Sequence, residues 1–192
     1  SCFFSGTSKM RQNKNIFYLL TASGCRTVVM RASGGTKKTR QNPLQSFTLL
    51  HVSAALHKSM STVYRVETLA PACWLQGPAL YAGLYVNEIT FKLTQKYEPE
   101  ADLMRSYQKV LQGLSALGIS ALDDPNLAIL LRTYEADLLS SVGYALDWGA
   151  LARISEASIA YDPYERGFYP DDVGFDRDLL RQLASEHYAD AK

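Results

Sequence analysis

Three cations lie close together in a segment that also contains glycine and proline. The stretch "ASGGTKKTRQNPLQSF", residues 32–47, carries Lys37, Lys38 and Arg40 and no Asp or Glu. Ammonium and guanidinium groups at this spacing can bind phosphates or other anions. A solvated surface loop is the other interpretation of the same residues, and the distribution of charge along the chain helps to choose between them.

The charges divide the chain into two parts of opposite sign. Residues 1–66 contain ten Lys or Arg and no acidic residue, whereas residues 67–192 contain ten Lys or Arg and nineteen Asp or Glu. The formal net charge of +1 therefore results from a basic part and an acidic part that nearly cancel. Such asymmetry is typical of proteins that bind nucleic acid or an anionic surface. The candidate residues for binding nucleic acid in the basic part are Arg26, Arg31, Lys37, Lys38, Arg40 and Lys58.

Residues that could support catalysis are present but form no recognisable pattern. The "GGTKKT" segment lacks the GxxxxGK[ST] spacing of a nucleotide-binding loop, the three histidines lack HExxH spacing, and the three cysteines form no CxxC pair. Aspartates could hold a divalent cation, but we prefer to interpret several of them as helix caps. These aspartates are Asp123, Asp124, Asp171, Asp172, Asp176 and Asp178. We therefore expect no catalytic residues, no metal and no cofactor.

The composition predicts a folded chain. It has 192 residues, of which 47% are hydrophobic and 20% charged. No apolar run approaches the roughly 18 residues that cross a membrane, and the opening "SCFFSGTSKM" lacks the charged-then-apolar order of a secretory signal. We therefore expect a cytoplasmic protein that does not contact membranes.

The first part of the chain has the pattern of short strands. Segments 15–21 and 25–32 flank a turn that contains Gly24, and 44–52 and 61–69 form a second pair of strand-like segments. Four or five short strands in this length favour a small barrel, and the five-stranded OB fold, which binds single-stranded nucleic acid, is the natural candidate. Three aromatic residues could stack on bases or belong to the core: Tyr18, Phe47 and Tyr64.

The second part of the chain has helical periodicity. Apolar stripes predict helices over 77–93, 99–118 and 124–148, and the first of these presents Leu80, Leu84, Asn87 and Phe91 on one face. We expect its polar residues Asn87 and Glu88 to form a network with the barrel. Residues 161–169 are a strand pair or a loop, and residues 175–187 a short helix. The fold class is thus α+β, with a small barrel domain at 1–72 and a mainly helical, acidic domain at 73–192.

Four stretches in this order resemble the RecO family. They are a basic loop followed by "LQSF" (44–47), "LYAGLYVNE" (80–88), "RTYEADLLSSVGYALDW" (132–148) and "RGFY" (166–169). The resemblance implies an OB barrel followed by a helical domain, the same order that the periodicity predicts. It also implies a bacterial, cytoplasmic, nucleoid-associated protein of DNA repair and recombination.

The function implied by the resemblance is that of a non-enzymatic recombination mediator. RecO proteins bind single- and double-stranded DNA, anneal complementary strands, engage the single-strand-binding protein SSB, and act with RecR to help load RecA. An OB-fold RNA-binding protein and, less favoured, a metal-dependent nuclease are the alternatives. The acidic helical domain would repel DNA, so we expect it to bind the protein partners.

The resemblance also points to a site for the C-terminal tail of SSB. The stretch "LLRTYEADLL" (130–139) matches the segment of RecO that supplies it, and such a tail needs a cation for its carboxylate beside an apolar pocket for its terminal Phe. The candidate residues are Leu131, Arg132, Tyr134 and Leu138. In the alternative interpretation, Arg132 pairs with Glu135 on the surface and the leucines are ordinary core.

Departures from the family pattern limit what is carried over. Ser46 and Thr133 stand where the family usually has Pro and often has Arg. Some members carry a four-cysteine zinc module, but residues 149–165 contain no cysteine, so zinc is not expected. The family usually continues beyond a point equivalent to Lys192, which raises the expectation that this chain is truncated and that a basic C-terminal segment is missing.

Overall fold

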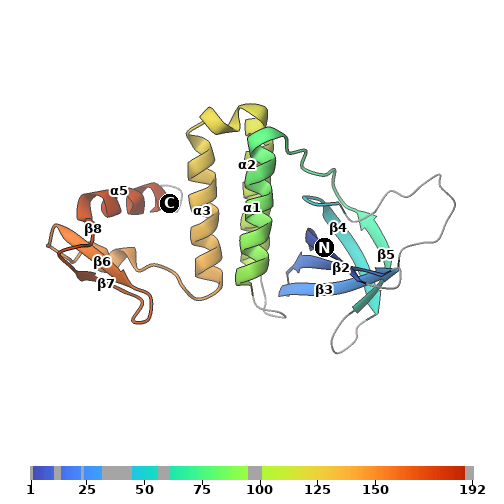
Figure 1. The fold of residues 1–192 in the computed structure, drawn as a ribbon, viewed down its shortest axis with the longest axis horizontal. Helices are drawn as coiled ribbons and strands as arrows, with labels where there is room; N and C mark the ends of the chain where they lie inside the picture. Colours follow the sequence, from blue (N-terminus) through green and yellow to red (C-terminus); the bar gives the residue numbers. More distant parts are fainter. Residues whose placement is uncertain are drawn as a thin grey trace. The chain divides into compact units, whose positions relative to one another are not determined.

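The structure is a computed structural model that describes residues 2–10, 14–22, 24–31, 45–55, 61–94 and 101–188 (Figure 1). The chain divides into two compact units, Ser1–Val142 and Gly143–Lys192. The first unit contains β1 (Cys2–Met10), β2 (Lys14–Thr21), β3 (Gly24–Arg31), β4 (Leu49–Ala55), β5 (Ser61–Thr68), α1 (Gly77–Leu93), α2 (Ala101–Leu117), the 3-10 helix η1 (Gly118–Asp123) and α3 (Asn126–Ser141). The second contains α4 (Trp148–Leu151), β6 (Ser158–Asp162), β7 (Gly167–Pro170), β8 (Phe175–Asp176) and α5 (Arg177–Tyr188).

The five N-terminal strands form a closed barrel. They pair in the order β1-β2-β3-β5-β4, and β4 pairs back onto β1 through Cys2↔Leu50 and Phe3↔Leu49. The β3–β5 pair is parallel and the other pairs are antiparallel. A five-stranded barrel followed by helices is the α+β, OB-like architecture that the sequence predicted. The boundary that we place between residues 72 and 73 lies in the segment joining β5 to α1 and stays a prediction.

Strand β2 is buried on both of its faces. Phe17 and Leu19 lie inside the barrel, in a cluster with Val28, Leu50 and Val63. Successive side chains of a strand point to opposite faces, and Leu20 accordingly belongs to a second cluster that it shares with the helices. This placement explains why the strand reads as a continuous apolar run instead of alternating.

The sequence did not single out β1 as a strand. Its composition is rich in Ser, Gly and Thr, and its register with β2 shifts between Phe4 and Gly6, which leaves one extra residue at that point. The strand depends on pairing with β2 along its whole length and on closing the barrel against β4. Local propensity carries little of this information.

Helix α1 begins with Pro78 in its first turn and has the bounds that the sequence predicted. Its buried face was predicted only in part: Asn87 is buried and Leu80 half-buried, whereas Leu84 and Phe91 are 47% and 44% exposed. The buried side chains are the smaller ones: Ala79, Ala82, Val86, Asn87 and Thr90. Small residues let α1 pack closely against several neighbours at once, and the element contacts show it against β1, α2, α3 and η1.

Two buried hydrogen bonds hold α1 to the other helices. Tyr107 of α2 donates its hydroxyl hydrogen to Asn87 Oδ1, and Thr90 shares a hydrogen bond with the Tyr134 hydroxyl of α3. The predicted polar network of Asn87 therefore joins helix to helix, not helix to barrel. Glu88 is exposed and pairs with Lys92 one turn along the same helix.

Helix α3 ends earlier than predicted. It stops at Ser141, and the predicted continuation to residue 148 is broken at Gly143, where φ is +83°. A positive φ suits glycine and ends a helix. The apolar residues after Gly143 continued the helical pattern in the sequence, but Trp148 begins a separate short helix, α4.

The second unit is built around a three-stranded sheet in the order β7-β6-β8. Its β6–β7 hairpin settles residues 161–169 as a strand pair, and the predicted last helix is α5. Arg166, in the hairpin turn, donates to the Gly143 carbonyl at 2.8 Å and lies 4.7 Å above the Tyr144 ring. Asp176 accepts from the Leu179 backbone N–H at 2.9 Å and caps α5, as expected.

Candidate functional site

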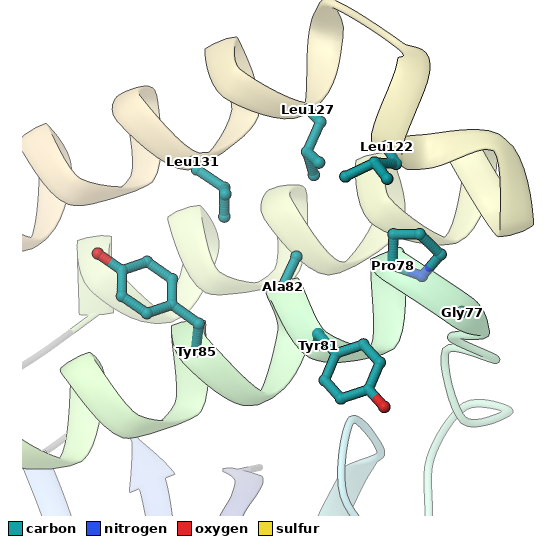
Figure 2. A pocket seen from close by; sticks show the side chains of 8 residues that line it. All are labelled: Gly77, Pro78, Tyr81, Ala82, Tyr85, Leu122, Leu127 and Leu131. Carbon is teal, nitrogen blue, oxygen red and sulfur yellow. The ribbon is translucent and has the colours of Figure 1, made fainter.

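An apolar hollow lies between α1, η1 and α3 in the first unit. Its volume is about 530 Å³. Figure 2 shows Tyr81, Ala82 and Tyr85 along one side and three leucines along the other. The lining residues are Gly77, Pro78, Tyr81, Ala82, Tyr85, Leu122, Leu127 and Leu131. The lining is almost entirely apolar, so a ligand that fits must bring an apolar group.

The local sequence explains why a hollow forms here. Ala82 is small, and the tyrosines four residues apart at 81 and 85 lie on the same side of α1. Gly77 starts the helix with φ of +53° beside Ile119 of η1, so the 3-10 turn lies near the beginning of α1. Leu122, from that turn, is 73% exposed and contributes an apolar wall that is open to solvent.

A chain of polar contacts runs along one end of the hollow. The Tyr85 hydroxyl donates to Glu135 Oε1 at 2.7 Å, and the Arg132 guanidinium pairs with Glu135 Oε2. The hydrogen bond to the Glu135 carboxylate is the main cause that raises the pKa of Tyr85. The side chain of Arg132 is 63% exposed, whereas that of Glu135 is 18% exposed. A positive charge is thus available to solvent next to an apolar hollow.

The residues predicted for the SSB tail separate into two groups. Leu131 lines the hollow, and Arg132 follows it on the same helix, so these two lie together. Tyr134 and Leu138 are each 1% exposed and belong to the core beneath, where Tyr134 bonds to Thr90. The Arg132–Glu135 pair of the alternative interpretation is also present.

Sequence reasoning missed the α1 and η1 side of the hollow. The tyrosines at 81 and 85 were visible in "LYAGLYVNE" as two large side chains one turn apart, and this spacing was the available signal. Leu122 carried no such signal, because its position depends on the 3-10 turn that connects α2 to α3.

The predicted DNA-binding residues lie partly outside the described residues. Arg26 is half-buried on β3, opposite Leu19 of β2. Arg31 ends β3, and its side chain is not described. Lys37, Lys38, Arg40 and Lys58 fall outside the described residues. All six assignments stay predictions.

Of the three aromatic residues proposed for base stacking, only one is open to solvent. Tyr18 lies against Phe91 of α1, with the ring centroids 4.3 Å apart, and Phe47 is 6% exposed in the core. Tyr64 on β5 is 74% exposed.

Three of the six aspartates considered for a metal site accept hydrogen bonds from backbone N–H groups. Asp124 Oδ1 accepts from the Asn126 N–H at 2.8 Å, and Asp171 Oδ1 accepts from the Val173 N–H at 2.7 Å. Within the described ranges, no three His, Cys, Asp or Glu side chains gather closely enough to hold a metal ion. In the same part of the chain, no helix has both the length and the apolar character needed to cross a bilayer.

Comparisons with known proteins give a consistent family. A family model described as "Recombination protein O C terminal" matches residues 75–173, which include all three long helices and the β6–β7 hairpin. The DNA repair protein RecO of Hahella chejuensis is 32% identical over 154 residues, which is 79% of this chain and 62% of that protein. RecO of Tolumonas auensis is 29% identical over 184 residues, 95% of this chain and 73% of that protein.

Other relatives are covered less completely. RecO of Stutzerimonas stutzeri is 32% identical over 139 residues, 71% of this chain but 55% of the relative. The chain thus spans about 55 to 73% of these relatives' length. The family match covers more than half of the chain and contains the α1–α3 hollow. The chain therefore belongs to the RecO family of DNA repair proteins.

Proposed function

We propose that this chain is a non-enzymatic recombination mediator whose barrel binds DNA and whose helices bind a protein tail. The observation that carries the proposal is the apolar hollow of about 530 Å³ with the exposed Arg132 beside it, on a chain whose acidic residues all lie after residue 66. Acting with RecR to help load RecA is part of the same proposal and is supported by family membership.

The DNA half of the proposal follows from electrostatics. Bringing two complementary strands together requires two polyanions to approach. A barrel domain with ten cations and no acid before residue 67 would neutralise phosphates on both strands and release their counterions. Annealing needs no covalent step, so it requires none of the catalytic patterns that the sequence lacks.

The protein half follows from the hollow. The C-terminal tail of SSB is acidic and ends in Phe. Its ring would enter the space between the tyrosines of α1 and the leucines of α3, and its carboxylates would pair with Arg132. Leu131 forms part of the wall, whereas Tyr134 and Leu138 support the wall from the core.

The tail site is tested with a fluorescent peptide that has the SSB tail sequence. Arg132→Ala should weaken peptide binding by about 1.5 to 3 kcal/mol, the range for a charge-assisted contact. Arg105→Ala is the matched control. Arg105 lies on the neighbouring helix α2, is also exposed, and pairs with an acid three residues before it on that helix. If both variants bind the peptide like the unmodified protein, the tail site lies elsewhere.

The DNA site is tested by salt dependence. About four phosphate contacts predict a log–log slope near −3 for single-strand binding, from roughly −0.7 per phosphate. Neutralising Lys37, Lys38 and Arg40 together should weaken binding to all sequences and flatten that slope. Neutralising Lys92, Arg105 and Lys109 of the helices removes the same charge and should leave the slope nearly unchanged. If the slope is unchanged when Lys37, Lys38 and Arg40 are neutralised, these residues do not contact phosphates and belong to a solvated surface loop.

The mediator activity itself is tested by annealing. The protein should anneal complementary strands that are coated with SSB, and Arg132→Ala should slow this reaction more than it slows annealing of bare strands. Competition between DNA and RNA oligonucleotides identifies the preferred nucleic acid. Failure to anneal either coated or bare strands would contradict the proposal.

A further inference from the structure

Strand β5 contains a β-bulge at Tyr64. Along β4 and β5, Ser53 pairs with Arg65 and the next residue, Ala54, pairs with Val63. Tyr64 is therefore the extra residue, because it lies between Val63 and Arg65 on β5, whereas their partners Ala54 and Ser53 are consecutive on β4. A bulge of this kind changes the direction of side chains and is common beside functional sites.

The bulge turns two consecutive side chains outward. Val63 is 7% exposed in the barrel core, and Val66 packs against the same cluster. In a regular strand, side chains alternate between the two faces, so two inward residues are separated by one outward residue. Here Tyr64 is 74% exposed and the side chain of Arg65 is 67% exposed. The barrel therefore presents an aromatic ring and a guanidinium side by side on its outer surface.

This part of the barrel is open. The helices contact the barrel mainly through β1 and β2, and Cys25 of β3 and Leu49 of β4 also pack in the helical core cluster. Strand β5 lies on the side of the barrel that faces away from the helices (Figure 1). Among the described residues, no hydrogen bond or ring contact of Tyr64 is seen, and Arg65 pairs with Glu67 on the same strand. Glu67 is the first acidic residue of the chain, and the residues before it carry only positive charges.

An unpaired nucleotide matches this surface. A base can stack on a tyrosine ring, and its phosphate can accept from a neighbouring guanidinium in exchange for Glu67. Paired bases in a duplex are already stacked on each other and offer only their edges and phosphates. A ring beside a cation in a basic domain thus favours single-stranded over double-stranded DNA.

We propose that Tyr64 stacks on an unpaired base and that Arg65 contacts the adjoining phosphate. The proposal rests on the DNA binding proposed above and adds a stacking site to it. The bulge is what makes the site, because it places both side chains on one surface. In annealing, such a site would release its base when the strand pairs, since pairing returns the base to a duplex stack.

The test compares single-stranded and duplex DNA. Tyr64→Ala should weaken binding to a short oligo(dT) about tenfold, in line with measured stacking contributions, and should not change the salt slope. Tyr64→Phe keeps the ring and should bind like the unmodified protein. Binding to a duplex of the same length should be the same for all three. Arg65→Gln should flatten the single-strand slope by about 0.7, the value for one phosphate.

The controls separate this proposal from the one on which it rests. Tyr164→Ala removes another exposed tyrosine, in the β6–β7 turn of the second unit, and should leave oligo(dT) binding unchanged. If the unmodified protein binds no single strand, the proposed function fails. If it binds and Tyr64→Ala binds equally well, the stacking site alone is wrong. The stacking proposal would also be overturned if Tyr64→Ala lost the same affinity for single strand and for duplex, or if Tyr64→Phe lost as much affinity for oligo(dT) as Tyr64→Ala.

Discussion

At the scale of single residues, the helical core depends on a buried tyrosine hydroxyl. Tyr107 has 0% exposure, and its hydroxyl donates to Asn87. Burial is the main cause that raises the pKa of Tyr107 well above its ordinary value. The folded protein therefore keeps the phenol neutral at pH values where an unfolded chain would lose that proton.

The stability of the first unit should consequently fall in alkali. Above about pH 10, the ordinary tyrosine pKa, unfolded Tyr107 ionises while folded Tyr107 does not, so the folded state binds more protons. The free energy of unfolding should decrease by up to about 1.4 kcal/mol per pH unit from this residue. Urea unfolding at pH 8, 10 and 11 measures the effect.

The Tyr107→Phe variant is the control for that measurement. It should be less stable at pH 8 by about 1 to 3 kcal/mol, because Asn87 loses its buried partner. It should also lose less stability than the unmodified protein between pH 10 and 11. Parallel losses in the two proteins would show that Tyr107 is not the group responsible.

A second prediction at this scale concerns Glu135. Its carboxylate occupies the Arg132 guanidinium and must give way to any carboxylate of a bound tail. Glu135→Gln keeps an oxygen that accepts from Tyr85 but removes the charge. We expect it to bind the SSB-tail peptide about two- to fivefold more tightly, the value of an exposed ion pair.

The control for Glu135→Gln is a peptide in which every carboxylate is an amide. This peptide should bind both proteins equally, because Glu135 competes only with negative charge. Weaker binding of the acidic peptide to Glu135→Gln would mean that Glu135 positions Arg132 and does not compete with the ligand.

At the scale of elements, the sequence predicted what local patterns encode. Pro78 and the apolar stripe gave the bounds of α1, and Asp176 was one of the two aspartates, with Asp178, that were expected to cap α5. The face that α1 buries was not predictable from size alone, because a helix with several neighbours buries its small residues at the closest approaches. The predicted end of α3 was wrong because Gly143 adopts a positive φ. The apolar residues on either side of Gly143 continue the helical pattern, so the pattern gave no sign of this break.

The candidate site shows the same limit. Arg132 and Leu131 were found because the stretch 130–139 resembles the RecO segment that supplies the tail site, whereas Leu122 comes from a turn whose position depends on packing. The pairing of Ser53 with Arg65 that creates the Tyr64 bulge is likewise a long-range property of two strands. No local pattern specifies such a register.

A prediction at this scale concerns the second unit. A Cβ on Gly174 would lie 2.5 Å from the carbonyl oxygen and 2.8 Å from the nitrogen of Ile159, in the backbone of β6. Backbone cannot move aside as a side-chain end can. Gly174→Ala should therefore destabilise this unit by about 3 kcal/mol, as severe overpacking does.

Gly167→Ala serves as the matched control in the same sheet. An added Cβ there meets only the Glu165 carbonyl oxygen, at 4.0 Å, so the variant should melt close to the unmodified protein. The fluorescence of Trp148, whose ring lies beside Phe168, follows the unfolding of this unit if Trp74 is replaced in both variants. Equal stability of the two variants would contradict the packing argument.

At the scale of the whole first unit, α1 connects the barrel to the other helices. Tyr18 of β2 packs against Phe91, and a Cβ on Gly83 would lie 3.2 Å from the Phe47 ring. On the same helix, Asn87 and Thr90 bond to α2 and α3. One core cluster includes residues from both sides of α1, so we expect barrel and helices to unfold together.

If oligo(dT) binds the barrel as proposed, it should therefore also stabilise α3. At a hundred times its dissociation constant, a ligand adds about 2.7 kcal/mol, which corresponds to a rise of about 10 °C in Tm for a unit of this size. Hydrogen exchange measures protection of the α3 amides directly. Protection that rises in the barrel but not in α3 would show that the two parts open separately.

The position of the hollow on α1 has a thermodynamic consequence. Tyr81, Ala82 and Tyr85 line it, and Gly83, between them in sequence, meets the barrel side of the same helix. Two ligands that bind one cooperative unit are linked, and linkage is reciprocal: if DNA changes the affinity for a tail by some factor, the tail changes the affinity for DNA by the same factor. A mediator that captured SSB more tightly once DNA was bound would, by the same free energy, hold its DNA more tightly until SSB departed.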